Sequence, residues 1–541
     1  MKPLYLNYCK QTFDENGALS RFELEYPACF NFSNDIVDVI AEQEPDRTAL
    51  IWCDHKGNER IFSFSDLKDL SCRAANYLTA KGIQRGDRVL VILKRHFEYW
   101  YTVLALHRMG AVAIPASFML STEDIAYRIR TAHIKAVICC EDEDVALNTR
   151  AAAGSCKLFN VRIDRPGFER LDIGLKSESS DFPRVPTKAT DPFLIYFTSG
   201  TTGFPKAVVH NYTYPLSHIM TAKYWQNVQD GGVHMSVADT GWGKASWGKI
   251  YGQWLCGSAV LAYDYHNFNP ADMMDVVARY HVCTFCAPPT FYRFLVKSGL
   301  DNYNFSTLRY VTTAGEALNP DIFEIFYQHT GLEIKEGNGQ TETTMLIGNL
   351  FDTASRPGSM GRPSPMYDLR IVDEDLCDVQ TGEAGEIVVV PRTYGLMDCY
   401  DKDTEATDIA FRGGVYHTCD TAYRDKDGFI WYVGRTDDII KSCGYRISPF
   451  EVESVLVKHP AVFECAVTGV PDAERGFAVK ATVVLQKGYE GSPALVRQMQ
   501  KFVKQQTAAY KYPRVIEFVK ELPKTSSGKI RRVEIRNRDK Q

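Results

Sequence analysis

"DLKDLSCRAANYLTAKGIQRGDRVLVIL" (residues 66–93) contains the local patterns from which the fold is predicted. Its first part carries apolar residues at helical spacing and ends in Gly82, a glycine suited to the position after a helix. "RVLVIL" (88–93) then has the composition of a buried strand. The apolar side of the predicted helix comprises Leu67, Leu70, Ala74 and Leu78.

The same alternation continues along the chain. "AVAIPA" (111–116) and "KAVICC" (135–140) are two further short apolar runs, and helix-period segments separate them. Strands that alternate with helices form parallel sheets with helices on both faces. We therefore predict an α/β fold.

Length and charge narrow the class of protein. A chain of 541 residues exceeds what one hydrophobic core usually supports, so we expect more than one domain. The net charge of −5 gives no general attraction to nucleic acid or to acidic membranes. No stretch approaches the roughly 18 apolar residues of a membrane span.

The cysteines and the N-terminal residues indicate a reducing compartment. Fifteen cysteines in 541 residues are too dilute for a disulfide framework. Cys283 and Cys286 have no second pair or paired histidines nearby, so we expect core residues in a strand and no zinc site. The first residues, "MKPLYLNYCKQ", lack the apolar core of a signal peptide, which favours the cytoplasm.

The last hundred residues form a separable pattern. "SPFEVESVLVKHP" (448–460) has Ser448 as N-cap, Pro449 at the first helical position and Glu451 placed to complete a capping box. Two strands, a helix from Ser492 and a strand at 514–519 follow, which is a small α+β unit. We predict a large N-terminal domain of sheets flanked by helices (1–434), a hinge (435–438) and a small mobile α+β domain (439–541).

"TSGTTGFPK" (198–206) has the composition of a phosphate-binding loop. Its glycines free backbone N–H groups, and hydroxyl side chains and one lysine add further donors, which suits a polyphosphate. It lacks the spacing of the common P-loop. Alone, the nonapeptide is also compatible with a polar surface turn.

Further motifs remove that ambiguity. The chain carries "TTAGEAL" (312–318), "EGNGQTET" (336–343), "YHTCDTAYRDKDGFIWYVGRTDDIIKSCGYRISPFEVE" (416–453) and "PKTSSGKIRR" (523–532) in this order. With "TSGTTGFPK", they make the chain resemble the AMP-forming acyl-CoA synthetases over nearly its whole length. This adenylate-forming superfamily also contains firefly luciferase and peptide-synthetase adenylation domains. The pattern is most similar to the medium-chain acyl-CoA synthetases.

The resemblance implies an ATP site. Glu342 matches the family's Mg²⁺ ligand, a hard oxygen donor suited to a cation that bridges phosphates. Asn338 stands where many relatives carry an aromatic side chain that stacks on adenine, so adenine recognition would differ. The phosphate-binding residues would be Thr198, Ser199, Gly200, Thr201, Thr202, Gly203 and Lys206. The adenine- and ribose-binding residues would be Gly315, Glu316, Glu336, Gly337, Asn338, Gly339, Gln340, Thr341, Asp420 and Arg435.

The resemblance also implies a catalytic lysine on the mobile domain. Lys529 would neutralise the charge that gathers as a carboxylate attacks the α-phosphate of ATP. The small domain would then rotate about Asp437, withdraw Lys529 and present a CoA-binding segment. That segment comprises Cys443, Gly444, Tyr445 and Arg446. Nothing supplies Cys443 with a base, so we do not expect a covalent thioester on it.

Four positions describe the acyl pocket. Gly339 stands where acetate-specific relatives have a tryptophan, so we expect room for a longer or branched chain. Trp242 and Trp247 are candidate walls in "DTGWGKASWGKIYGQW" (239–254). Lys244 lies between them. Three alternatives stay open for its side chain: it turns outward, it pairs with an acidic residue, or it contacts a polar group of the substrate.

We therefore predict an ATP-dependent acid:CoA ligase that activates a short-to-medium or branched carboxylic acid through an acyl-adenylate. ATP and CoA are its expected substrates and Mg²⁺ its expected ion, and it is expected as a monomer or homodimer. One alternative is a stand-alone adenylating enzyme that transfers the acyl group to a carrier protein. Another is a non-catalytic nucleotide-binding regulator.

Overall fold

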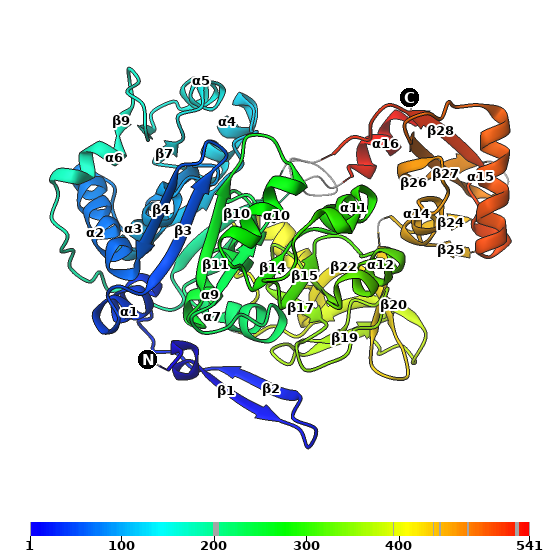
Figure 1. Ribbon diagram of the computed structural model, residues 1–541, viewed down its shortest axis with the longest axis horizontal. Helices are drawn as coiled ribbons and strands as arrows, with labels where there is room; N and C mark the ends of the chain where they lie inside the picture. The colour runs from blue at the N-terminus through cyan, green and yellow to red at the C-terminus, as the bar shows by residue number, and fades with distance from the viewer. Residues whose placement is uncertain are drawn as a thin grey trace. The chain divides into compact units, whose positions relative to one another are not determined.

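The structure is a computed structural model that describes residues 2–198, 205–392, 394–436, 438–442, 445–472, 475–524 and 530–539. It folds into two compact units (Figure 1). The first contains residues 1–198, 205–368 and 391–411, and the second contains residues 369–390 and 412–541. The predicted boundary at 434 and the hinge stay predictions, and Asp437 lies outside the described residues.

An eight-stranded sheet forms one layer of the first unit, in the order β21-β11-β10-β6-β5-β7-β8-β9. Strands β10, β6, β5 and β7 are parallel, so their carboxyl ends lie at one edge of the sheet. The strands predicted at 88–93, 111–116 and 135–140 are confirmed as β5, β6 and β7. The bounds are β5 Arg88–Ile92, β6 Val112–Pro115, β7 Ala136–Cys139, β8 Lys157–Asn160, β9 Glu169–Arg170, β10 Pro192–Thr198, β11 Lys206–Asn211 and β21 Cys399–Tyr400.

The helix predicted beside this sheet is α2 (Phe64–Ala80). Ser63 and Asp66 close a capping box at its start, which satisfies backbone donors that a helix end leaves free. Gly82 follows with φ +81°, a conformation that favours glycine. The next helix, α3 (Glu98–Met109), is buried along its whole length.

A nine-stranded sheet forms the other main layer of the first unit, in the order β18-β17-β16-β15-β14-β12-β13-β3-β4. Helices α10 (Pro270–Arg279), α11 (Pro289–Ser298) and α12 (Pro320–Thr330) contribute to the apolar core against it. Cys286 is buried in this sheet, as expected of a core cysteine, whereas Cys283 precedes β14 and is only half-buried. The bounds are β3 Thr48–Asp54, β4 Glu59–Ser63, β12 Val233–Ser236, β13 Ala259–Asp264, β14 Thr284–Cys286, β15 Tyr310–Ala314, β16 Ile334–Gly339, β17 Met345–Gly348 and β18 Arg362–Pro363.

The second unit holds two smaller sheets. One has the order β19-β20-β22-β23, and the other has the order β25-β24-β27-β26 with β28 paired to β27. Helices α14 (Pro449–Leu456) and α15 (Pro493–Gln506) pack on the latter and share its apolar core. The bounds are β19 Leu369–Val372, β20 Ala384–Val389, β22 Tyr416–Arg424, β23 Ile430–Arg435, β24 Ile440–Ser442, β25 Tyr445–Ile447, β26 Val462–Asp472, β27 Gly476–Leu485 and β28 Val515–Val519.

The small α+β pattern of the C-terminal residues is confirmed, with one local correction. Ser448 Oγ accepts a hydrogen bond from the backbone N–H of Glu451 at 3.2 Å, as predicted. The carboxylate of Glu451 does not complete the capping box. It contacts Lys511 Nζ at 2.6 and 2.7 Å, because a full charge competes better for the carboxylate than a backbone N–H.

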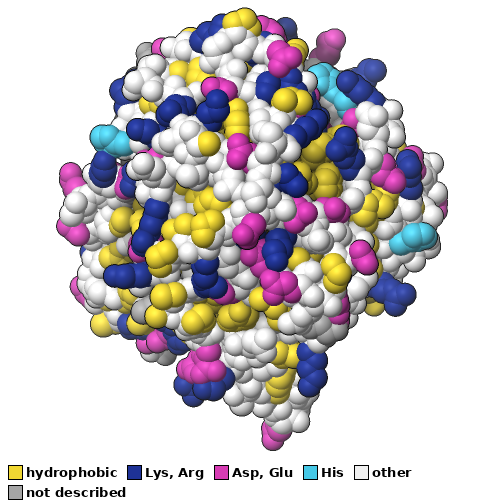
Figure 2. All heavy atoms as spheres, turned by 90° about the vertical axis from the view of Figure 1, so that its left-hand side faces the viewer, with side chains coloured by type: hydrophobic (Ala, Val, Ile, Leu, Met, Phe, Trp, Pro, Cys, Tyr) yellow, Lys and Arg dark blue, Asp and Glu magenta, His cyan; other side chains and the backbone are white. Residues whose placement is uncertain are grey.

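The surface carries no strong single charge on the face shown in Figure 2. Lys and Arg side chains alternate there with Asp and Glu. At the lower edge of Figure 1, the hairpin of β1 (Cys9–Phe13) and β2 (Leu19–Leu24) extends from the first unit. Among the described helices, none has the length and apolarity needed to cross a membrane.

Candidate active site

The predicted phosphate loop is framed by a β-hairpin. Thr198 ends β10, Lys206 begins β11, and the two residues are direct partners across the strand pair. Thr198 therefore lies at the edge where the parallel strands end, a usual place for ligands in α/β folds. The loop residues Ser199, Gly200, Thr201, Thr202 and Gly203 lie outside the described residues.

Lys206, Tyr400 and Glu342 meet beside this hairpin, and we call them the hairpin cluster. Lys206 Nζ lies 4.7 Å from the ring centroid of Tyr400, a cation–π distance. Tyr400 Oη donates a hydrogen bond to Glu342 Oε1 at 2.9 Å. Within the described part of the chain, neither Lys206 nor Glu342 forms an ion pair. A cation and a carboxylate are thus held on one tyrosine with their charges available to a ligand.

The donor set of the hairpin cluster suits a Mg²⁺ ion that arrives with a nucleotide. Mg²⁺ is commonly held by one or two carboxylates together with substrate phosphates and water. Glu342 supplies one carboxylate, and its backbone is fixed because its carbonyl accepts a hydrogen bond from the Met397 N–H at 2.7 Å.

The predicted adenine-binding residues of the first unit come from two neighbouring strand ends. β15 and β16 are parallel, with Ala314 opposite Gly337, so the segments that follow them lie side by side. Gly315 has φ +103°, which favours glycine at this turn. Gly315 and Glu316 follow β15, while Glu336, Gly337, Asn338 and Gly339 end β16 and lead into Gln340 and Thr341.

Two of these residues serve the protein interior. Glu336 is buried, and its Oε2 accepts a hydrogen bond from the Leu318 N–H at 3.3 Å, which ties β16 to the loop after β15. Burial raises the pKa of Glu336 to about 8, and that hydrogen bond offsets only part of the rise. Gly337 faces the ring of Trp225, where an added Cβ would lie 2.5 Å from the indole. Glu336 and Gly337 therefore pack against the protein interior and support the predicted adenine-binding segment.

The two residues predicted to bind ribose are neighbours in the second unit. Asp420 on β22 and Arg435 on β23 are direct partners across the strand pair. Arg435 Nη1 lies 3.8 Å from Asp420 Oδ1. Asp420 is buried, so an acceptor and a donor are held together at one point of this sheet.

The space beside Gly339 differs from the sequence expectation. An added Cβ there would lie 2.6 Å from the ring of Trp247 and 2.2 Å from the carbonyl oxygen of Thr344. The missing side chain therefore makes room for Trp247 and does not open the pocket. Trp247 is buried and packs edge-to-face on Trp225, with ring centroids 5.9 Å apart.

The other acyl-pocket residues lie around the short helix α8 (Gly243–Gly248), which Trp242 precedes. Lys244 Nζ donates a hydrogen bond to the carbonyl of Ala314, so it turns toward the adenine-side loop. Lys249, which sequence reasoning passed over, is fully buried just after α8. Burial, together with nearby Arg95, lowers the pKa of Lys249 to about 7.

Few residues of the predicted tail site can be placed. Cys443, Gly444 and Lys529 lie outside the described residues, as does the side chain of Arg446 on β25. Tyr445 is 51% exposed and stacks on Tyr510, with ring centroids 4.1 Å apart. An exposed aromatic pair of this kind offers a flat surface to a ligand.

Two protein-family models together match most of the chain. The AMP-binding enzyme family matches residues 37–401, and the AMP-binding enzyme C-terminal domain matches residues 451–529. The chain belongs to this enzyme family. The resemblance drawn from the motifs is thereby confirmed.

Named relatives support the same assignment. The mitochondrial acyl-coenzyme A synthetase ACSM3 of Mus musculus is 38% identical over 560 residues, covering 100% of this chain and 96% of the relative. The mitochondrial acyl-coenzyme A synthetase ACSM4 of Rattus norvegicus is 39% identical over 545 residues, covering 98% and 94%. Both are mitochondrial proteins, and the cytoplasmic location of this chain stays a prediction.

Solved structures agree with the fold. The anthranilate CoA ligase AuaEII in complex with anthranoyl-AMP is 27% identical with a TM-score of 0.87, covering 95% of this chain and 98% of that one. A benzoate CoA ligase from Burkholderia xenovorans LB400 is 27% identical with a TM-score of 0.82, covering 94% and 100%. The predicted α/β class with a smaller C-terminal part is confirmed.

Proposed function

We propose that this protein is an AMP-forming acyl-CoA synthetase. A carboxylate would attack the α-phosphate of ATP to give an acyl-adenylate and pyrophosphate, and CoA would then displace AMP to give the thioester. The observation that carries the proposal is the hairpin cluster, in which Lys206 and Glu342 flank Tyr400 beside the phosphate motif. Family membership supports it independently.

In the first half-reaction, the described residues would bind and orient ATP. Lys206 would hold the phosphates that leave as pyrophosphate, because its ammonium is already positioned by the ring of Tyr400. Glu342 would hold Mg²⁺, which screens the phosphate charge when bound. Tyr400 fixes the Glu342 carboxylate through its hydroxyl, so the anion is preorganised.

The second half-reaction would use the C-terminal residues. Lys529 would assist adenylation and then withdraw as the small domain rotates about Asp437. The segment with Gly444, Tyr445 and Arg446 would next line the path of the CoA thiol. Adenylation and thioester formation would thus each use different residues of the small domain. This suits two reactions in which charge develops at different atoms.

We propose a short-to-medium or branched carboxylic acid as the substrate. Trp247 fills the space beside Gly339, so the acyl site is bounded at this point. Lys244 and the buried Lys249 bring polar groups to the same segment, which favours an acid with a compact or functionalised chain over a long plain one. The aromatic acids in the names of the two solved structures make aromatic acids a sensible addition to the test.

The test is an acid panel. Purified protein is mixed with ATP, Mg²⁺, CoA and straight, branched and aromatic acids, and AMP and acyl-CoA are measured. The proposal expects equal amounts of both with at least one acid. Trp247→Ala should shift the preference toward bulkier acids. No AMP with any acid would contradict the proposal. Release of pyrophosphate with neither AMP nor acyl-CoA, followed by AMP release when a carrier protein is added, would favour transfer to a carrier protein.

A further inference from the structure

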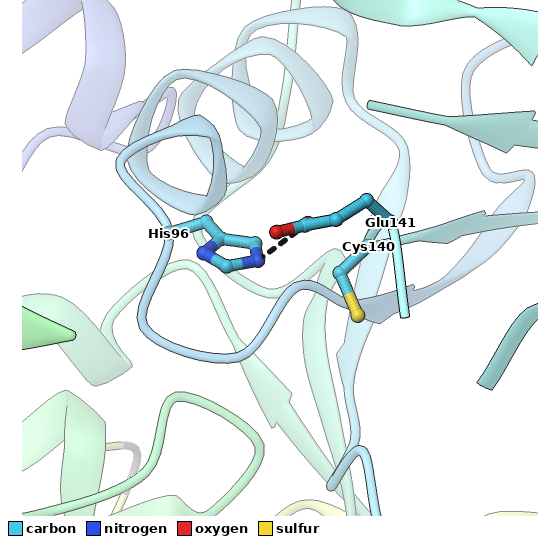
Figure 3. A group of neighbouring side chains, drawn as sticks. All are labelled: His96, Cys140 and Glu141. Carbon is cyan, nitrogen blue, oxygen red and sulfur yellow. Dashed lines mark ion pairs between the residues drawn. The ribbon is translucent and has the colours of Figure 1, made fainter. Parts of the chain in front are cut away.

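A second group of side chains lies at the edge of the eight-stranded sheet, beyond β5 and β7. His96 lies in the loop after β5, and Cys140 and Glu141 directly follow β7. These strands are parallel neighbours, so the three residues meet where both strands end. Figure 3 shows the side chains of His96 and Glu141 directed toward one another, with Cys140 beside them. We call them the histidine cluster.

The donor atoms of the histidine cluster converge. A ring nitrogen of His96, the sulfur of Cys140 and a carboxylate oxygen of Glu141 all lie within 4.8 Å of one another. His96 Nε2 is 2.8 Å from Glu141 Oε2. The two atoms form an ion pair with each other, and both are buried without a further hydrogen-bond partner among the described residues. Buried polar atoms that lack partners call for an explanation.

The opposite side of the imidazole is fixed by a carboxylate. His96 Nδ1 lies 2.6 Å from Oδ2 of Asp264, the last residue of β13. Histidines that bind metal ions commonly direct their second nitrogen at a carboxylate, which sets the orientation of the ring. Asp264 thus holds His96 with Nε2 turned toward Cys140 and Glu141.

The chemistry of the donors selects the ion. Imidazole, thiolate and carboxylate together suit zinc, whereas Mg²⁺ and Ca²⁺ prefer oxygen ligands alone. Three protein ligands leave a fourth position for water. The side chain of Glu141 is 39% exposed, which gives an ion a route from solvent. We propose that His96, Cys140 and Glu141 bind a zinc-class divalent cation.

The ion would join separate parts of the first unit. It would cross-link the loop after β5 to the end of β7 and, through Asp264, reach β13. The adjoining Arg95 pairs with Asp239 at 2.9 Å, and Asp239 begins the acyl-pocket segment. Binding would therefore stabilise the folded first unit and the support of the acyl pocket.

Cobalt titration of the full chain tests the proposal. The protein is stripped with a chelator and titrated with Co²⁺, whose bond to a thiolate gives a charge-transfer absorption band. We expect one equivalent to bind with this band and Zn²⁺ to displace it. Cys140→Ser should abolish the band. Cys139→Ser should retain it, because Cys139 is equally buried but faces Thr149.

A second measurement keeps the test valid if the Cys140 variant does not fold. Glu141→Gln alters a partly exposed side chain and should weaken Co²⁺ binding about tenfold or more while the far-ultraviolet circular dichroism is retained. Zn²⁺, and not Mg²⁺, should raise the melting temperature of the wild type. A band of equal size in wild type and Cys140→Ser, or no stoichiometric binding to the wild type, would overturn the proposal and assign these contacts to an ion-pair network only.

Discussion

The hairpin cluster and the buried pair of Arg95 and Asp239 contrast in how their charges are satisfied. Lys206 and Glu342 have no ion-pair partner among the described residues. In the second region, Arg95 pairs with Asp239 at 2.9 Å, and both side chains are buried. Charges left for a ligand indicate function, whereas buried charges that satisfy one another hold the fold. Variants in the two regions should therefore separate catalysis from stability.

The largest effect is expected in the second region. Arg95→Met leaves the carboxylate of Asp239 buried without its cation, and both side chains are only 7% exposed. Breaking such a pair typically costs about 3–5 kcal/mol. The melting temperature should fall by several degrees. The exposed pair of Arg21 and Glu23 provides the control, because Arg21→Met should change stability by roughly 0–1 kcal/mol. Equal effects of the two variants would remove the contrast.

The next effect concerns Lys529, whose proposed role is in adenylation. Lys529→Ala should slow adenylation by roughly 10²–10³-fold, as expected for one lost electrostatic contact in the transition state. Thiolysis of a supplied acyl-adenylate should remain. Lys524, which pairs with Glu464 at 2.7 Å, is the matched control on the same tail. Equal loss of both half-reactions would contradict the assignment of Lys529 to the first step.

Glu342→Gln tests the hairpin cluster itself. The variant retains the shape of the side chain but loses the charge, and a contact of this kind contributes about 1.5–3 kcal/mol. Adenylation should fall by roughly tenfold to a hundredfold, with little change in melting temperature. Tyr400→Phe keeps the ring beneath Lys206 and should cost less. A wild-type adenylation rate for Glu342→Gln would exclude this carboxylate from the site.

The smallest effect concerns Glu336, a buried residue of the predicted adenine-binding motif "EGNGQTET" (336–343). Between pH 4.5 and about 8, folded Glu336 keeps a proton that the unfolded chain releases, so its contribution to stability falls as pH rises. Glu336→Gln removes this dependence. The melting temperature of the variant relative to the wild type should therefore increase through this window. A difference that does not change with pH would contradict the raised pKa.

The elements that could be predicted from the sequence are those whose apolar pattern lies within one segment. Helix α2 and strands β5, β6 and β7 were predictable because their apolar spacing and caps lie within each segment. Tyr400 was missed because it reaches Glu342 only through the pairing of β21 with β11, which no local pattern reports. The histidine cluster was missed for the same reason, since its residues and Asp264 come from three separate strand ends.

The interpretation of Gly339 failed for a related reason. A glycine in a motif indicates where a side chain is absent, but not which neighbour takes the space. Trp247, distant in sequence, fills it. The prediction of a pocket for acyl chains therefore needs packing information that a single motif does not contain.

The most direct test of an acyl-adenylate mechanism is acid-dependent exchange of labelled pyrophosphate into ATP in the absence of CoA. Exchange requires that ATP and the acid form an adenylate reversibly before the thiol is present. We predict exchange with every acid that yields acyl-CoA, and none without acid. Thioester formation without any such exchange, or exchange that does not depend on the acid, would contradict the account.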